Sequence, residues 1–106
     1  MAGQTVDFGI DLGTTNSVIA RSTSSGVKIV KNRLQRELTP SAVARTRSGQ
    51  TLVGQDALNK ADLVPATKFK RLMGTRNTVS LADGSEWLTE SLSAEVLKDL
   101  KASVQR

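Results

Sequence analysis

The residues best suited to chemistry lie together in one short run, Gly9-Ile10-Asp11-Leu12-Gly13-Thr14-Thr15-Asn16-Ser17. An apolar stretch leads to an acid, which is followed by a glycine, two threonines and an asparagine. A glycine permits a positive φ and lets an anion approach the backbone, and successive N–H groups in a turn can form an anion-binding nest. Threonine hydroxyls add donors that can rotate toward a ligand. The run therefore favours a phosphate-binding turn made by Gly13, Thr14, Thr15 and Asn16.

Asp11 has a different expected role, because a carboxylate and a phosphate repel each other. An Asp beside a phosphate site more often holds Mg²⁺, commonly through water molecules that the ion keeps. The simpler alternative is an ordinary hairpin turn in which Asp11 and the threonines make only local hydrogen bonds. The run is neither a Walker loop nor a dinucleotide-binding fingerprint, because no Gly-Lys-Ser/Thr follows and the pattern around it is strand–turn–strand.

Strands are expected on both sides of this turn. The apolar residues of the stretch Thr5–Leu12 alternate, at Val6, Phe8, Ile10 and Leu12. This period of two is typical of a strand, and β-prone runs at 17–23 and 27–30 follow after short turns. The first thirty or so residues therefore predict a three-stranded antiparallel meander.

Further along the chain, hairpins and helices are expected to alternate. We expect hairpins with strands at 42–46 and 51–53 and around the turn Asp83-Gly84. Helices are expected over Gly54–Asp62, with Ala57, Leu58 and Ala61 on one face, and over Pro65–Met73, ending at Gly74. A last helix should begin with Ser93 as N-cap and Glu95 in its first turn, and place Val96, Leu97, Leu100 and Val104 on its apolar side.

Composition limits the possible functions. The chain has 106 residues and a formal net charge of +5, and it contains neither Cys nor His. This excludes a disulfide framework, a thiolate or imidazole metal site, and any catalytic triad that needs those side chains. The basic excess lies in 28–47 and 60–76, which suits an anionic partner. No secretory signal and no run of about 18 apolar residues is visible, so we expect a soluble, cytoplasmic protein.

Five segments, in order, resemble landmarks of the 70-kilodalton heat-shock (DnaK-type) chaperone family. The phosphate turn itself, Asp11-Leu12-Gly13-Thr14-Thr15-Asn16-Ser17, is similar to that family's phosphate loop almost letter for letter. The other four are Leu38-Thr39-Pro40-Ser41, Thr51-Leu52-Val53-Gly54-Gln55-Asp56-Ala57, Phe69-Lys70-Arg71-Leu72-Met73-Gly74 and Leu92-Ser93-Ala94-Glu95-Val96-Leu97-Lys98. They span nearly the whole chain. Short connections at 61–67 and after Gly74 depart from the family pattern and indicate a divergent branch.

The resemblance implies site residues and cofactors. The turn Gly13, Thr14, Thr15 and Asn16 would hold the β- and γ-phosphates of ATP or ADP. Asp11 would contact Mg²⁺ through water, and Lys70 would be the catalytic lysine that reaches the γ-phosphate and positions the attacking water. Such roles suit phosphoryl transfer, where the protein supplies position and positive charge. The alternative for Lys70 is a solvated basic helix with no specific contact.

The resemblance also implies an α/β fold, an incomplete lobe of the ribonuclease H-like type shared by actin, sugar kinases and heat-shock ATPases. Residues 1–106 would form the N-terminal part of a nucleotide-binding domain. Within it, 1–32 would be the phosphate-loop meander, 33–92 a small α+β subdomain with hairpins and the lysine helix, and 93–106 the start of the next helix.

The implied function is that of an ATP-dependent molecular chaperone, which couples ATP hydrolysis to the binding of unfolded client polypeptides. Its partners would be those clients, a J-domain co-chaperone and a nucleotide-exchange factor, with no nucleic acid and no membrane. The parent protein would be an ATPase. We expect the 106 residues alone to bind ATP weakly or not at all, not to hydrolyse it, and to self-associate through exposed apolar surface and edge strands.

Two other functions remain open from the residues. One is a sugar kinase or actin-like ATPase fragment, which would share the Asp-x-Gly-Thr turn. The other is a small basic nucleic-acid-binding domain that uses residues 28–47 as its electrostatic footprint. Against the second, no aromatic residue lies near those basic side chains, and Phe8 and Phe69 occupy core-like positions.

Overall fold

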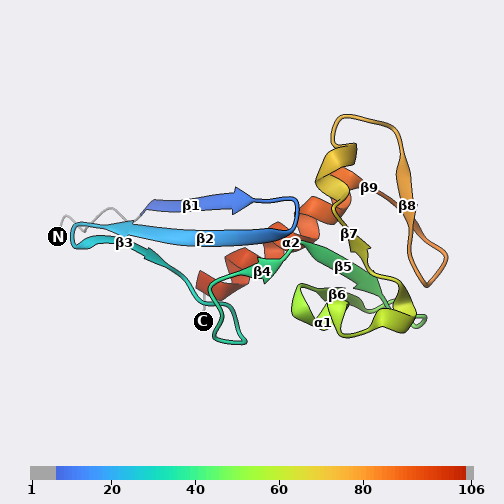
Figure 1. The fold of residues 1–106 in the computed structure, drawn as a ribbon, viewed down its shortest axis with the longest axis horizontal. Coiled ribbons are helices and arrows are strands. Elements are labelled where there is room, and N and C mark those ends of the chain that lie inside the picture. Colours follow the sequence, from blue (N-terminus) through green and yellow to red (C-terminus); the bar gives the residue numbers. More distant parts are fainter. Residues whose placement is uncertain (1–6, 105–106) are drawn as a thin grey trace.

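A four-stranded antiparallel sheet forms the N-terminal part of the chain (Figure 1). The computed structural model describes residues 7–104, so the expected placement of Thr5 and Val6 in the first strand lies outside the described residues. β1 (Asp7–Leu12) pairs with β2 (Asn16–Thr23), and β2 pairs with β3 (Gly26–Ile29). The predicted meander is confirmed. The short β4 (Thr39–Pro40) adds to it by pairing with the first two residues of β2.

Two smaller antiparallel sheets follow and confirm both predicted hairpins. The first consists of β5 (Ala42–Arg45), β6 (Thr51–Val53) and β7 (Ala66–Thr67), with β5 in the middle. The second consists of β8 (Thr78–Ser80) and β9 (Glu86–Leu88). Figure 1 shows the meander at one end of the molecule and the β8–β9 hairpin at the other. The whole measures 50 × 29 × 22 Å.

The helix predicted over Gly54–Asp62 is wrong in its extent. The chain forms only the four-residue α1 (Gln55–Leu58) and then the separate 3₁₀ turn η1 (Ala61–Leu63). Of the three residues expected on one apolar face, only Ala57 is buried, and Leu58 is 41% exposed. A helix gains most of its stability from packing an apolar face, and here Leu63 of η1 joins Ala57 in the buried cluster in place of Leu58 and Ala61.

The helix predicted over Pro65–Met73 is also wrong. Ala66 and Thr67 instead form β7, which pairs with β5, and Lys68 has a left-handed backbone with a φ of 54°. Only the 3₁₀ turn η2 (Phe69–Leu72) remains of the expected helix. Sheet pairing has overridden local helix propensity here, as tertiary context often does.

The last helix, α2 (Thr89–Val104), begins four residues before the predicted N-cap, so Ser93 lies buried inside it. Its buried residues Leu92, Val96 and Leu100 lie in the main core, where α2 packs against β2 of the meander and against β5 and β6 of the three-stranded sheet. Figure 1 shows α2 running from the β8–β9 hairpin to the underside of the meander. α2 is therefore the element that joins the two ends of the molecule into one core. The main core cluster contains Ile19, Val43, Ala66, Phe69, Leu81, Leu92, Val96 and Leu100.

The two phenylalanines differ in their environment. Phe69 is 3% exposed and lies in the core, as expected, whereas Phe8 is 47% exposed. Phe8 and Ile10 border an open apolar groove of about 560 Å³ between the meander and α2, with Leu97 on the opposite wall. The prediction of a core position for Phe8 is wrong for the described structure, because α2 covers Ile19 but leaves β1 open.

Arg45 ties the β5 sheet to the β8–β9 hairpin. Its Nε donates to Asp83 Oδ2 at 3.0 Å, its Nη1 donates to Thr51 Oγ1 at 2.9 Å, and its guanidinium lies 5.3 Å from the Trp87 ring. Hydrogen bonds from the Ser85 hydroxyl and amide, together with the Arg45 charge, lower the pKa of the Asp83 carboxyl from its ordinary value. The hairpin turn is thus held by charge and by hydrogen bonds as well as by its glycine.

Within residues 7–104, no helix is both long enough and apolar enough to span a bilayer.

Candidate phosphate-binding site

The turn between β1 and β2 is closed most tightly at Gly13. A Cβ on this residue would lie 2.2 Å from the backbone oxygen of Asn16, a separation that no side chain tolerates. Gly13 is not among the glycines with positive φ. The need for glycine at this position therefore comes from the close approach of two backbone segments and not from a left-handed conformation.

Ser41 fixes the turn from outside. Its Oγ donates to the Gly13 carbonyl at 2.8 Å and lies 2.8 Å from the Ser17 hydroxyl, and its amide donates to the Thr15 carbonyl at 2.8 Å. Ser17 and Ser41 are both buried. The strand pairing ends at Leu12 opposite Ser17, so the loop that closes the hairpin comprises the four residues 13–16. Loops of this length are most often built around a type I turn, which needs no positive φ, and neither Thr14 nor Thr15 has one. The turn is therefore held in shape by Ser41 as well as by its own backbone.

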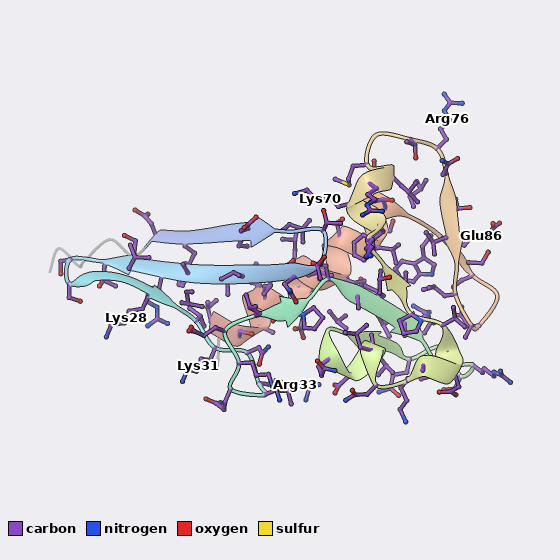
Figure 2. All side chains as sticks on the ribbon, viewed as in Figure 1. Lys28, Lys31, Arg33, Lys70, Arg76 and Glu86 are labelled. Atoms are coloured by element: carbon purple, nitrogen blue, oxygen red, sulfur yellow. The ribbon has the colours of Figure 1, made fainter. Side chains whose placement is uncertain are left out.

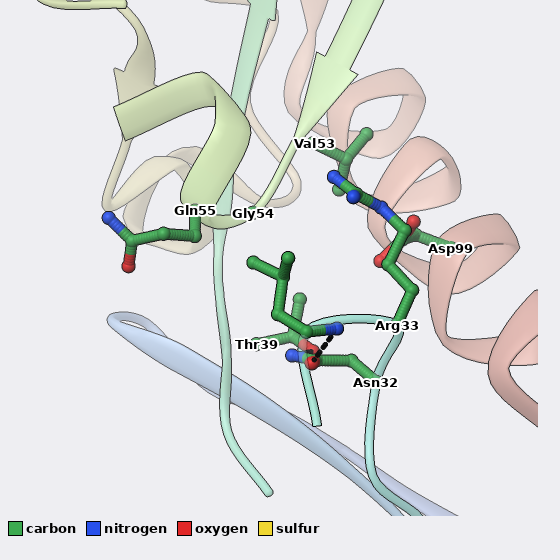
Figure 3. A pocket seen from close by; sticks show the side chains of 8 residues that line it. Asn32, Arg33, Thr39, Val53, Gly54, Gln55 and Asp99 are labelled. Atoms are coloured by element: carbon green, nitrogen blue, oxygen red, sulfur yellow. Dashed lines mark hydrogen bonds between the residues drawn. The ribbon is translucent and has the colours of Figure 1, made fainter. Parts of the chain in front are cut away.

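Asn32 brings Ser41 to that place. Its side-chain amide donates to Thr39 Oγ1 at 3.0 Å and to the Leu38 carbonyl at 3.2 Å. Its side-chain oxygen accepts from the Leu34 and Arg36 amides. Figure 3 shows Asn32 beside Thr39, lining a cavity of about 10 Å³ where this loop meets Gly54. The loop from Asn32 to Thr39 is thus a closed unit that sets the position of β4, and β4 in turn leads directly into Ser41.

Two threonines of the turn border a cavity and have unused hydrogen-bond donors. Thr14 and Thr15 line a pocket of about 190 Å³ together with Ser41, Thr67 and Lys68. Among the hydrogen bonds found within residues 7–104, none uses the amide or the hydroxyl of either threonine. Four donors on two neighbouring residues, with a lysine on the same cavity, are suited to binding an anion such as a phosphate group.

Lys70 lies on η2 and is exposed to solvent; Figure 2 labels it on this segment. Phe69, the first residue of η2, is buried and anchors η2 in the core. Lys68, two residues earlier, is the lysine that lines the pocket with Thr14 and Thr15. No ion pair within the described part of the chain engages Lys68 or Lys70. The Lys68 charge is consequently available to a ligand in the pocket beside the turn, whereas Lys70 does not line that pocket.

Asp11 and Asn16 lie on either side of the turn, and neither lines the pocket that Thr14 and Thr15 border. Asp11 is exposed on β1, opposite Val18. Asn16 borders a neighbouring cavity of about 440 Å³ together with Arg36 and Gln55. No group of three or more acidic side chains in residues 7–104 could hold a metal ion by itself. A single carboxylate near a phosphate site still fits Mg²⁺, since that ion is usually bound by one or two carboxylates, waters and phosphate oxygens.

The structure thus brings together Gly13, Thr14 and Thr15, and it adds two residues that sequence reasoning did not assign to the site. Ser41 was recognised only as part of the Thr39-Pro40-Ser41 landmark, and Lys68 only as a member of a basic stretch. The landmark Leu38-Thr39-Pro40-Ser41 was the one feature of the sequence that could have pointed to Ser41 as a site residue. Nothing in the local sequence indicated Lys68, because its position depends on the unexpected strand β7.

Comparison with known proteins shows which family the chain resembles over nearly its whole length. Residues 7–106 match the family described as Hsp70 protein. The chaperone protein DnaK of Thermotoga neapolitana is 43% identical over 101 residues, which cover 92% of the chain and 17% of that protein.

Two further DnaK chaperones show the same extent. The protein of Thermotoga maritima is 44% identical over 97 residues, covering 88% of the chain and 16% of the relative. The protein of Mycoplasmopsis agalactiae is 38% identical over 98 residues, covering 91% and 16%. The chain therefore spans about one sixth of the length of these curated relatives.

Proposed function

The chain belongs to the Hsp70 family, and on that premise we propose that its β1–β2 turn binds the phosphates of ATP or ADP. The chain would form part of a nucleotide-binding lobe of the ribonuclease H-like type. The antiparallel meander with the phosphate turn at its first hairpin supports this fold. The domain boundaries at 32 and 92 remain part of the same proposal.

One observation carries the proposal: the four unused donors of Thr14 and Thr15 lie on a turn that Ser41 already holds in shape. Donors that are fixed before a ligand arrives need little reorganisation on binding, which is the condition under which they stabilise charge best. An ordinary hairpin turn would satisfy its own polar groups locally. In the β1–β2 turn, Ser41 donates its hydrogen bonds to carbonyl groups. The N–H and O–H groups of Thr14 and Thr15 have no hydrogen-bond partner among the described residues.

The residues would share the work as follows. Gly13, Thr14, Thr15 and Asn16 hold the β- and γ-phosphates, and Asp11 takes part in holding Mg²⁺ through water. Lys70 provides positive charge at the γ-phosphate and positions the attacking water, with Lys68 as a second cation at the pocket. Bound Mg²⁺ would neutralise charge on the phosphate oxygens.

In the longer protein, this site would serve an ATP-dependent molecular chaperone. The relatives are named as DnaK chaperones. We propose that hydrolysis there is coupled to the binding of unfolded polypeptides, with a J-domain co-chaperone and a nucleotide-exchange factor as partners, in the cytoplasm.

The 106-residue chain alone should bind nucleotide weakly. Each of the four donors contributes about 1 kcal/mol net, and the cations add a similar amount. Association and ordering cost several kcal/mol against this, so the dissociation constant should be no tighter than roughly a millimolar. We expect no measurable hydrolysis. A low-micromolar affinity for Mg²⁺–ATP would contradict this proposal of a partial site.

The role of Lys70 can be tested by measuring pyrophosphate affinity for Lys70→Met beside a matched control, Lys98→Met. Lys98 is also an exposed lysine, but it lies on α2 and pairs with Glu95. Lys70→Met should weaken binding about fivefold, which corresponds to roughly 1 kcal/mol, and Lys98→Met should leave it unchanged. Equal losses in both variants would show that only net charge matters, and no loss in either would exclude Lys70 from the site.

The open groove beside β1 supports self-association of the isolated chain. An unpaired strand edge next to exposed Phe8 and Ile10 is a surface on which a second copy can pack. Sedimentation equilibrium of the wild type and Ile10→Lys tests this. The variant should be monomeric at concentrations where the wild type associates, and a wild type that stays monomeric at high concentration would refute it.

A further inference from the structure

β3 is the outer strand of the meander, and one side of its backbone is unpaired among the described residues. β4 also pairs with β2, but only at Asn16 and Ser17, and so leaves β3 uncovered. The Val30 amide donates to the Ile19 carbonyl, in register with the β2–β3 pairing. Because hydrogen-bonded pairs alternate in an antiparallel ladder, the N–H and C=O groups of Val27 and Ile29 point away from β2.

The free edge also has exposed apolar side chains. Val27 is 70% exposed and Ile29 is 44% exposed. Both lie on the same face of the sheet, because they are two residues apart in a strand. A strand added beside β3 could therefore hydrogen-bond to two free backbone positions and pack its own apolar side chains against these two residues.

Positive charge surrounds this edge. Lys28 lies between the two apolar residues, and Lys31, Arg33 and Arg36 follow within the next loop. Figure 2 shows Lys28, Lys31 and Arg33 along the outer side of the meander. Arg33 pairs with Asp56, whereas no ion pair with another described residue engages the remaining three. Glu37 is the only acid between residues 28 and 47.

We propose that the β3 edge, defined as Gly26–Ile29 with Lys31 and Arg36, binds an extended acidic peptide segment of a partner protein by strand addition. In this mode of recognition, main-chain hydrogen bonds supply affinity and alternate side chains supply specificity. The ligand would alternate acidic and β-branched residues, so that carboxylates face the cations and apolar side chains cover Val27 and Ile29.

The same features disfavour the other occupants. A second copy paired antiparallel so that the outward-facing Val27 lies opposite Ile29 of its mate would place Lys28 opposite the mate's Lys28, and like charges directly opposite destabilise a strand pair. A nucleic acid would lack stacking partners, since no aromatic residue lies between 24 and 47. An acidic strand meets neither obstacle.

The experiment uses the 106-residue chain, labelled with ¹⁵N, and the capped peptide Asp-Val-Glu-Ile-Asp-Val-Glu. The expected result is saturable shifts over residues 26–31 and slower hydrogen exchange of the Val27 and Ile29 amides. A peptide in which lysine replaces every acid is the probe control and should not bind. Failure of the acidic peptide to bind at millimolar concentration, or shifts confined to the β1 groove, would overturn the proposal.

Variants of the chain distinguish binding at the β3 edge from non-specific attraction between opposite charges. The double variant Lys28→Glu/Lys31→Glu should bind the peptide at least roughly tenfold more weakly. Arg76→Glu is the matched control, because Arg76 is exposed at the far end of the molecule (Figure 2) and should not affect binding. Val27→Pro removes an outward N–H and should also weaken binding. Equal losses in the Arg76 control, or tighter binding of a single-stranded oligonucleotide than of the peptide, would refute strand addition.

Discussion

Removing the hydroxyl of Ser41 should loosen the phosphate turn and destabilise the fold. In Ser41→Ala, the Gly13 carbonyl and the buried Ser17 hydroxyl both lose a hydrogen bond of 2.8 Å, while the bond from the residue 41 amide to Thr15 remains. Each lost bond costs about 1 kcal/mol, and more where a buried group is left unsatisfied. The expected loss in the free energy of unfolding is therefore about 2–3 kcal/mol.

A double-mutant cycle separates the two bonds. Ser17→Ala should cost about 1 kcal/mol, because it removes only the bond to Ser41. In the double variant that bond can be lost only once, so its cost should fall short of the sum of the single costs by about 1 kcal/mol. Ser48→Ala is the matched control: Ser48 is exposed on a hairpin turn, and its loss should cost no more than about 0.5 kcal/mol.

Urea unfolding, followed by the fluorescence of Trp87, the chain's single tryptophan, measures the stability of the wild type and all four variants. Trp87 packs against the main core, so its emission should report global unfolding. The reasoning fails if Ser41→Ala costs no more than Ser48→Ala, or if the costs of Ser17→Ala and Ser41→Ala are additive. The first result would mean that the Ser41 hydroxyl does not hold the turn, and the second that its bond to Ser17 contributes nothing to stability.

Three further predictions concern other parts of the chain. Gly13→Ala should destabilise the protein by about 2 kcal/mol or more, because its Cβ would lie 2.2 Å from the Asn16 oxygen; a urea midpoint equal to that of the wild type would contradict this. Thr89→Val should leave stability unchanged or raise it by about 1 kcal/mol, because Thr89 Oγ1 is buried with no hydrogen-bond partner among the described residues; a clear loss of stability would reveal a partner for it. The folded-state pKa of Asp83 lies below the model-peptide value of 3.8, so its contribution to stability is complete above that value and disappears as pH falls through the folded-state pKa. The urea midpoint of the wild type should accordingly fall more steeply than that of Asp83→Asn between about pH 4 and pH 2, and parallel curves would refute the role of this carboxyl.

Sequence reasoning identified the strands and the turn because their signals are local. Alternating apolar residues and Asp83-Gly84 have meanings that depend little on distant parts of the chain, and the meander and both hairpins are confirmed. The turn between β1 and β2 consists of contiguous residues, so the proposed phosphate-binding residues Gly13, Thr14 and Thr15 could be considered together from the sequence.

The errors arose where distant contacts decide local structure. Residues 65–73 have adequate helix propensity, yet Ala66 and Thr67 pair with β5 instead, and that pairing is what brings Lys68 to the pocket. Similarly, α2 begins at Thr89, about one turn before the predicted N-cap Ser93, and this added turn includes Leu92, which lies in the core. The contacts of Ser41 span 24 to 28 residues of sequence, and only the structure could show that it supports the turn.

The central claim is that Thr14 and Thr15 bind phosphate in this chain, and a map of amide shifts on addition of pyrophosphate tests it most directly. If Thr14 and Thr15 bind phosphate, the amide shifts should be confined to residues 13–16 and to Lys68 and Lys70, saturate at millimolar pyrophosphate and be strongly reduced in Ser41→Ala. Shifts spread over the basic stretch 28–36, or no shifts at Thr14 and Thr15 at high pyrophosphate concentration, would contradict phosphate binding by these two threonines.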